Sequence, residues 1–260
     1  MVADTSRMTK SSPKIRLFVP DDLSADTAIT LSRDQSHYVV RVMRQGVGDL
    51  ANVFNGRDGE WLARIEDASK SACRLALSER TRPQPAEPDI WLVFAPIKKA
   101  RLDVLVEKAV ELGASRLVPI LTERTDVRRV NVDRLSATAM EAAEQCERLS
   151  VPNVDSPSGL QTFLSTFPED RRLFVLDETG EGAPMTQAFS RSPTGSRIVA
   201  AILVGPEGGF SPTELDALRD LPFVTLVTLG PRILRAETAA VTALACWQTL
   251  VGDGCETRRR

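Results

Sequence analysis

Two apolar runs near the end of the chain each stop at a glycine and proline turn. Residues 198–204 read Ile-Val-Ala-Ala-Ile-Leu-Val without a polar break, and residues 223–229 read Phe-Val-Thr-Leu-Val-Thr-Leu. A continuous apolar run is typical of a strand in a parallel sheet that is covered on both faces. A helix start follows each turn, with Ser211 as the N-cap of the first helix and residue 236 near the start of the second. Both turns should therefore lie at the carboxyl edge of one sheet, where α/β sheets bind ligands.

Further strands and helices alternate in the part of the chain that precedes these turns. Strands are expected at residues 90–95, 116–121 and 172–177, and helices at residues 100–112 and 132–149. Alternating strands and helices predict an α/β fold with a mainly parallel sheet. From the pattern alone, a doubly wound topology is expected, because knotted chains are rare.

The first third of the chain has a different pattern, with short alternating runs separated by turns. The runs cover residues 50–54, 60–66 and 72–77, and the turns include Asn55-Gly56 and Asp58-Gly59. Short strands joined by such turns predict a small β-barrel.

Residues 36–46 have helical spacing. The periodicity places Val39, Val42 and Met43 on one face, while His37, Arg41 and Arg44 share another face. A small barrel that carries a cationic helical face is a plausible RNA-binding module, and the alternative is a β accessory domain with a solvated basic face.

A proline-rich segment separates the two patterns. Residues 81–88 contain three prolines, which is typical of a semi-rigid linker. The predicted organisation is a disordered tail at 1–13, a β-barrel at 14–82, a linker at 83–88, an α/β domain at 89–252 and a charged tail at 253–260.

Composition limits the partners and the compartment. The net charge of the 260 residues is −2, and residues 1–82 carry 13 Lys and Arg against 11 Asp and Glu, so RNA contacts must come from local basic patches. The single histidine and four cysteines without a CxxC pair argue against a metal site and favour a reducing compartment. No signal sequence and no run of 18 apolar residues is present, so a cytoplasmic protein without a membrane segment is expected.

The glycine turns do not fit the common nucleotide motifs. The chain has no GxxxxGK[ST] sequence and no GxGxxG sequence with an acidic residue about 20 positions later. A lone turn of this kind is most often an ordinary tight connection, but two matched turns indicate a ligand site for a different cofactor.

The sequences GPEGGFS at 205–211 and LGPRILRAETA at 229–239 resemble the signature of the RsmE family, the 16S ribosomal RNA uridine N3-methyltransferases of the SPOUT superfamily. This resemblance implies an S-adenosyl-L-methionine site in a C-terminal domain with a trefoil knot. It also implies an N-terminal PUA-like RNA-binding domain, a homodimer, and the 16S ribosomal RNA of the small ribosomal subunit as partner. The segments at 36–46, 98–113 and 144–152 are also similar to the family, although Glu147 stands where the family usually has Gly.

The resemblance carries over to individual residues. Those implied at the cofactor are Leu176, Leu203, Val204, Gly205, Pro206, Glu207, Gly208, Gly209, Leu229, Gly230, Ile233, Leu234, Arg235, Thr238 and Ala239. Those considered for RNA binding are Arg16, His37, Arg41, Arg44, Lys98, Lys99, Arg124 and Arg148, each with a solvated charge as the alternative. An RNA contact of Arg148 stays open, because the bulky acidic neighbour Glu147 could redirect or neutralise the Arg148 side chain.

Uridine N3 carries a proton at neutral pH, so the reaction requires a base or a cation that stabilises the uridinate. Arg235 is the candidate cation, and Glu207 or Glu237 is the candidate proton acceptor, with capping of backbone amides as the alternative role of Glu207. Two other functions stay open: methylation of another RNA position such as a ribose 2′-hydroxyl, and a non-catalytic ribosome assembly factor that keeps the fold.

Overall fold

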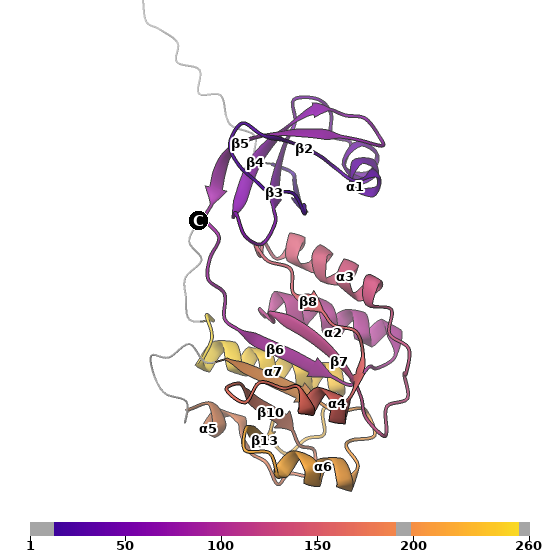
Figure 1. The fold of residues 1–260 in the computed structure, drawn as a ribbon, viewed down its shortest axis with the longest axis vertical. Coiled ribbons are helices and arrows are strands. Elements are labelled where there is room, and N and C mark those ends of the chain that lie inside the picture. Colours follow the sequence, from indigo (N-terminus) through magenta and orange to yellow (C-terminus); the bar gives the residue numbers. More distant parts are fainter. Residues whose placement is uncertain (1–12, 191–198, 255–260) are drawn as a thin grey trace, which may run out of the picture. The chain divides into compact units, whose positions relative to one another are not determined.

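The computed structural model describes residues 13–190 and 199–254, which divide into two compact units. Unit 1 contains the residues up to Pro85 together with the short segment Glu147–Ser150. Unit 2 contains Ala86–Cys146 and the chain from Val151 onward (Figure 1). The boundary falls within the proline-rich segment at 83–88, while most of the tails expected at 1–13 and 253–260 lies outside the described residues.

Unit 1 is built on one five-stranded sheet. Its elements are β1 (Ile15–Phe18), β2 (Ala28–Thr30), α1 (Arg33–His37), the π-helix η1 (Tyr38–Val42), β3 (Leu50–Phe54), β4 (Glu60–Asp67) and β5 (Arg74–Arg82). The strand order is β1-β3-β4-β5-β2, with β1 parallel to β3 and the other neighbours antiparallel. Gly56 and Gly59 turn the chain between β3 and β4 with φ angles of +84° and +85°, which glycine adopts without strain.

The barrel predicted for this unit is not closed by strand pairing among the described residues. β1 and β2 form the two edges of the sheet, although they are neighbours in the sequence. One face of the sheet buries a core that includes Leu17, Val53, Ile65 and Leu75.

The helical segment of unit 1 differs from a regular α-helix. Ser32 and Gln35 form a capping box that starts α1. The next turn is wider, since the Met43 amide donates to the Tyr38 carbonyl five residues earlier at 2.9 Å. Val39 is fully buried, but the wider turn carries Val42 off the expected apolar face, and Val42 is 58% exposed. The predicted apolar face is therefore wrong at Val42.

Unit 2 contains a parallel sheet. Its strands are β6 (Ile90–Phe94), β7 (Arg116–Leu121), β8 (Asn153–Val154), β9 (Ser158–Gly159), β10 (Arg172–Leu176), β11 (Ala183–Pro184), β12 (Ala200–Val204) and β13 (Val224–Thr228). The order is β11-β13-β10-β12-β6-β7-β8, with β9 beside β7, and every pair is parallel. The α/β prediction is confirmed for this unit. β10 lies between β12 and β13 and is parallel to both, so its carboxyl end lies at the same edge of the sheet as the two glycine turns.

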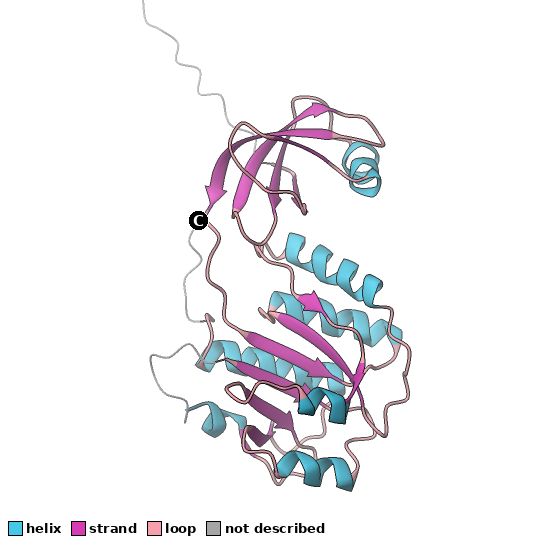
Figure 2. Ribbon diagram, viewed as in Figure 1, coloured by secondary structure: helices cyan, strands magenta, loops and turns pink. Residues whose placement is uncertain are grey.

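Helices cover both faces of this sheet (Figure 2). They are α2 (Lys99–Glu111), α3 (Val132–Gln145), α4 (Leu160–Ser165), α5 (Met185–Ser190), α6 (Pro212–Arg219) and α7 (Ala236–Leu250). Val93, Val175 and Leu203 point to the face packed by α4 and α6, and Phe174 points to the opposite face, where its ring lies 4.8 Å from that of Phe189 in α5. Trp247 of α7 is 1% exposed and belongs to the core.

Helix α3 ends at Gln145, four residues before the predicted end. Glu147 has a φ of +62°, in the left-handed region that breaks a helix and favours glycine. This is the position where the resembled family usually has Gly, which would adopt this conformation more easily than Glu147 does.

Candidate functional site

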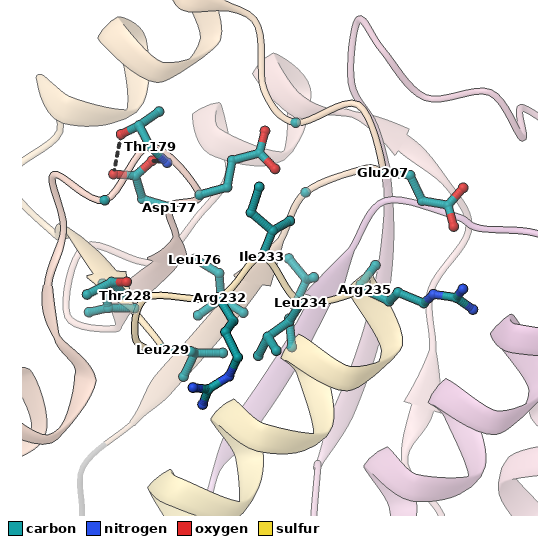
Figure 3. Close-up of a pocket in the computed structure, with 18 of the residues that line it drawn as sticks. Leu176, Asp177, Thr179, Glu207, Thr228, Leu229, Arg232, Ile233, Leu234 and Arg235 are labelled. Carbon is teal, nitrogen blue, oxygen red and sulfur yellow. Dashed lines mark hydrogen bonds between the residues drawn. The ribbon is translucent and has the colours of Figure 1, made fainter.

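A pocket of about 600 Å³ lies at the carboxyl ends of β10, β12 and β13, within the range that holds small ligands (Figure 3). Its walls come from three chain segments that are distant in the sequence. The lining residues are Arg101, Leu176, Asp177, Glu178, Thr179, Gly180, Val204, Gly205, Pro206, Glu207, Gly209, Phe210, Val227, Thr228, Leu229, Gly230, Pro231, Arg232, Ile233, Leu234, Arg235, Ala236 and Ala239.

The first wall is the turn after β12. The Gly209 amide donates to the Pro206 carbonyl at 2.9 Å, and Gly209 has a φ of +67°. A side chain at Gly205 would meet the Phe210 ring at 2.8 Å, so the ring packs directly on bare backbone. Ser211 then starts α6 with a complete capping box, as the sequence predicted.

The second wall is the turn after β13. Gly230 has a φ of +105°, and an irregular stretch leads to Arg235, the N-cap of α7. Ile233 is 85% exposed and projects over the middle of the pocket (Figure 3). An apolar side chain held in this position favours an apolar or aromatic part of a ligand.

The end of β10 forms the third wall, where the resemblance to the family implied Leu176 and its neighbours. Asp177 is 6% exposed, and its carboxylate accepts hydrogen bonds from the Thr179 amide at 3.0 Å and from the Thr179 hydroxyl at 2.8 Å. The neighbours of Leu176 that line this wall, which the sequence did not name one by one, are Asp177, Glu178, Thr179 and Gly180.

Most of the residues implied at the cofactor line this pocket, but three do not. The Leu203 side chain lies in the core on the α4 and α6 side of the sheet, because successive residues of a strand point to opposite faces. Gly208 and Thr238 also lie outside the lining.

Arg101 contacts both candidate proton acceptors. Its guanidinium forms ion pairs with the Glu207 carboxylate and, at 3.6 Å, with Glu237 Oε1. Its role beside the carboxylates was missed, because this contact joins residues more than 100 positions apart.

The other pocket arginines are arranged differently. Arg232 and Arg235 are exposed and make no ion pair within the described part of the chain. Figure 3 shows the Arg235 side chain extending past the rim of the pocket on the side of Glu207. A cation without an internal counter-charge is available to an anionic group on a substrate.

Arg124 lies beside the first turn in the same unit. Its Nη1 donates to the Gly208 carbonyl at 3.0 Å, and the neighbouring Glu123 amide donates to Glu214 at 2.8 Å. The loop after β7 thus supports the first turn, which gives Arg124 a structural contact in addition to the predicted RNA contact.

The predicted RNA-binding residues lie in contrasting surroundings. His37 and Arg41 are exposed on the helical segment of unit 1, where Tyr38 is 37% exposed. Arg44 is also exposed, but it lies two residues beyond the end of η1 with a φ of +54°, so it does not continue the predicted helical face. Lys98 and Lys99 are exposed at the start of α2 in unit 2. RNA contact by these residues stays a prediction.

Arg16, by contrast, is held inside unit 1. Its side chain is 10% exposed, its Nε donates to Glu60 Oε1 at 2.6 Å, and its guanidinium lies 3.8 Å from the centre of the Phe54 ring. Burial lowers the pKa of Arg16, and the bond to Glu60 opposes that shift. These contacts indicate a structural role, which sequence patterns could not distinguish from a solvated strand end.

The segment Glu147–Ser150 is anchored by the same cluster. Arg16 donates to the carbonyl of Arg148, and Arg82 Nη1 donates to that of Glu147 at 3.1 Å. The Glu147 carboxylate lies 4.0 Å from Arg82. Arg148 Nη2 donates to the Ser150 hydroxyl at 3.2 Å.

The pocket combines apolar surface with charged side chains of both signs, and its basic residues are Arg101, Arg232 and Arg235. Leu176, Leu234 and Ile233 supply apolar surface, while Glu178 and Glu207 supply negative charge. In the described residues there is no group of three or more His, Cys, Asp or Glu that could hold a metal ion. No helix of the described part is long and apolar enough to cross a bilayer.

Two family models match the chain. Residues 84–248 match an RNA methyltransferase domain, and residues 31–78 match an RNA methyltransferase PUA domain. The PUA range falls in unit 1, and the methyltransferase range falls in unit 2 apart from residues 84–85 and the segment Glu147–Ser150.

Curated relatives match over nearly the whole length. Ribosomal RNA small subunit methyltransferase E of Rickettsia conorii is 34% identical over 93% of this chain and 97% of its own length. The protein of that name from Synechocystis is 34% identical over 88% of this chain and 76% of its own.

Solved structures agree with this result. Ribosomal RNA small subunit methyltransferase E from Neisseria gonorrhoeae, solved with S-adenosyl methionine, is 27% identical with a TM-score of 0.82. A methyltransferase from Legionella pneumophila in complex with the same cofactor is 29% identical, also with a TM-score of 0.82. Each alignment covers 92% of this chain and 98% of the other.

Proposed function

The chain belongs to the ribosomal RNA small subunit methyltransferase E family, and on this premise we propose that it transfers a methyl group from S-adenosylmethionine to N3 of a uridine in 16S ribosomal RNA. The names of the relatives support the small-subunit RNA as substrate, and the two complexes support the methyl donor. The choice of N3 rests on the resemblance of the two glycine turns to the family signature.

The pocket is the observation that carries the proposal. Its 600 Å³ volume, its bare glycine backbone and its mixture of apolar and acidic side chains fit the adenine, sulfonium and amino-acid parts of the donor. The turn at Gly205–Gly209, the turn at Leu229–Arg235 and the end of β10 at Leu176–Thr179 would hold it. The bound donor supplies an electrophilic methyl group on a positively charged sulfur.

The acceptor nitrogen must lose its proton before or during methyl transfer. Arg235, exposed at the rim and without an ion pair in the described residues, would stabilise the negative charge that develops on the uracil oxygens. Glu207 and Glu237 lie on the same side, and either would accept the proton, directly or through water. Because N3 is on the Watson–Crick edge, the target base must be unpaired or flipped out.

Unit 1 would bind the RNA. His37, Arg41 and Arg44 are exposed on the module that matches a PUA domain, and the two arginines supply positive charge. Phosphate contacts of this kind position an RNA without reading its sequence. We further infer a trefoil knot in unit 2, a homodimer and a cytoplasmic location, each from the family resemblance.

The test is methyl transfer from labelled S-adenosylmethionine to small-subunit particles and to naked 16S RNA, followed by mass analysis of the nucleosides. Labelled N3-methyluridine is expected. A ribose 2′-O-methyl product would favour another RNA position, and the absence of transfer to either substrate would favour a non-catalytic assembly factor.

A further inference from the structure

Arg101 connects the two turns that enclose the pocket. Glu207 belongs to the turn after β12, and Glu237 belongs to the first turn of α7, directly after the second glycine turn. One guanidinium, carried at the start of α2, contacts both carboxylates. We propose that Arg101 is a positioning residue that holds these two turns at the spacing required by the methyl donor.

The two ion pairs differ in burial. The Glu207 side chain is 40% exposed, and exposed pairs contribute little by themselves. The Glu237 side chain is 16% exposed, and its second oxygen, Oε2, is buried without a hydrogen-bond partner in the described residues. A largely buried carboxylate that loses its only cation is strongly destabilised. Loss of Arg101 should therefore displace the start of α7 and the glycine turn before it.

The contacts of Arg101 also distinguish it from its neighbours. Lys98 and Lys99 are exposed and make no ion pair within the described residues, so they are free to bind phosphate. The Arg101 guanidinium is occupied by two carboxylates and lines the pocket. We therefore expect substitution of Arg101 to weaken donor binding and not RNA binding.

This inference rests on the proposed function, and calorimetric titration with S-adenosylmethionine tests it. Relative to wild type, Arg101→Gln should raise the Kd about tenfold, and Arg101→Lys should recover part of that loss because it keeps one charge. At saturating donor, kcat should fall as well, since Arg101 pairs with both candidate proton acceptors and the start of α7 carries Arg235, so donor affinity and its partial recovery in Arg101→Lys are the readouts that test the positioning role. Lys108→Gln is the matched control, because Lys108 lies on the same helix and, within the described residues, pairs only with Glu107 and Glu111 on the surface.

Glu207→Gln keeps the test decisive if Arg101→Gln folds poorly, because it removes only the exposed partner and should also weaken donor binding. With a folded Arg101→Gln, the double variant Arg101→Gln/Glu207→Gln should bind the donor no more weakly than Arg101→Gln. Donor affinity within twofold of wild type in folded Arg101→Gln and in Glu207→Gln would overturn the inference. A wild type that binds no donor would instead contradict the proposed function itself.

Discussion

Glu178, at the end of β10, lies against Gly209 in the turn after β12, and no space for a side chain is left between them. Gly209 also has a φ of +67°. We expect Gly209→Ala to lower the free energy of unfolding by about 1–2 kcal/mol, because a Cβ is strained in this backbone region. The variant should also weaken S-adenosylmethionine binding about tenfold, since the turn that forms the first wall is strained and the Glu178 carboxylate must swing away from the added Cβ.

Gly46→Ala is the control for this substitution. A Cβ added at Gly46 would meet no atom within 4 Å, and the φ of Gly46 is not positive. Gly46→Ala should bind the donor as wild type does. Equal affinities in Gly209→Ala and Gly46→Ala would contradict the placement of Gly209 in the donor pocket.

Arg235→Ala should separate chemistry from donor binding. We expect at least a 100-fold loss of RNA methylation, the usual effect of removing a group that stabilises developing negative charge. Affinity for S-adenosylmethionine should stay within a few fold, measured by calorimetry, and Arg235→Lys should recover part of the rate. Wild-type turnover of Arg235→Ala would remove this residue from the mechanism.

Reversing the charge of Arg41 and Arg44 should weaken RNA binding and reduce its dependence on salt. Each phosphate contact that is lost lowers the slope of log K against log salt by somewhat less than one. Filter binding of 16S RNA between low and physiological salt measures that slope. Lys70→Glu/Arg80→Glu changes the net charge of unit 1 equally at other exposed positions; if it gave the same loss, the effect would be attributed to overall charge.

The left-handed backbone at Glu147 predicts opposite effects for two substitutions. Glu147→Gly should be at least as stable as wild type, because relief of a strain of about 1–2 kcal/mol exceeds or balances the added entropy of the unfolded chain. Glu147→Val should be less stable by about 1–2 kcal/mol, since a β-branched residue is an outlier there. Urea unfolding of wild type, Glu147→Gly and Glu147→Val measures the order of their stabilities. A valine variant as stable as the glycine variant would contradict the predicted order.

Asp58 should make the stability of unit 1 depend on pH. Its Oδ2 accepts hydrogen bonds from the Leu23 amide at 3.0 Å and from Asn55 at 2.6 Å, and these bonds lower the pKa of Asp58 below its usual 3.8. A lowered folded-state pKa stabilises the fold above the unfolded-state value, and this stabilisation is lost as the pH falls through the folded-state value.

The difference in free energy of unfolding between wild type and Asp58→Asn should therefore have its full value at pH 7 and shrink below about pH 4. Urea unfolding at several pH values measures this difference. A difference that stays constant down to pH 2 would show that the charge of Asp58 is not responsible.

The sequence predicted best where structure depends on local chemistry. The strand, turn and helix around Gly205–Ser211 could be read from the sequence because an apolar run, glycines and a capping box are neighbours in the chain. Non-local relationships could not be predicted in this way. The placement of β10 between β12 and β13 and the contacts of Arg101 depend on tertiary pairing.

The predictions from sequence that failed in unit 1 did so for a similar reason. An α-helical period placed Val42 on an apolar face, but a π-helix, which sequence period does not reveal, exposes it. A strand-end arginine looks the same in sequence whether it is solvated or buried, and Arg16 is buried because Glu60, 44 positions away, supplies its counter-charge.

The central claim is that the two glycine turns and the end of β10 together enclose a methyl donor. Calorimetric titration of the folded wild-type protein with S-adenosylmethionine tests it most directly. The account predicts saturable binding that S-adenosylhomocysteine displaces. A folded protein that takes up neither compound would contradict it.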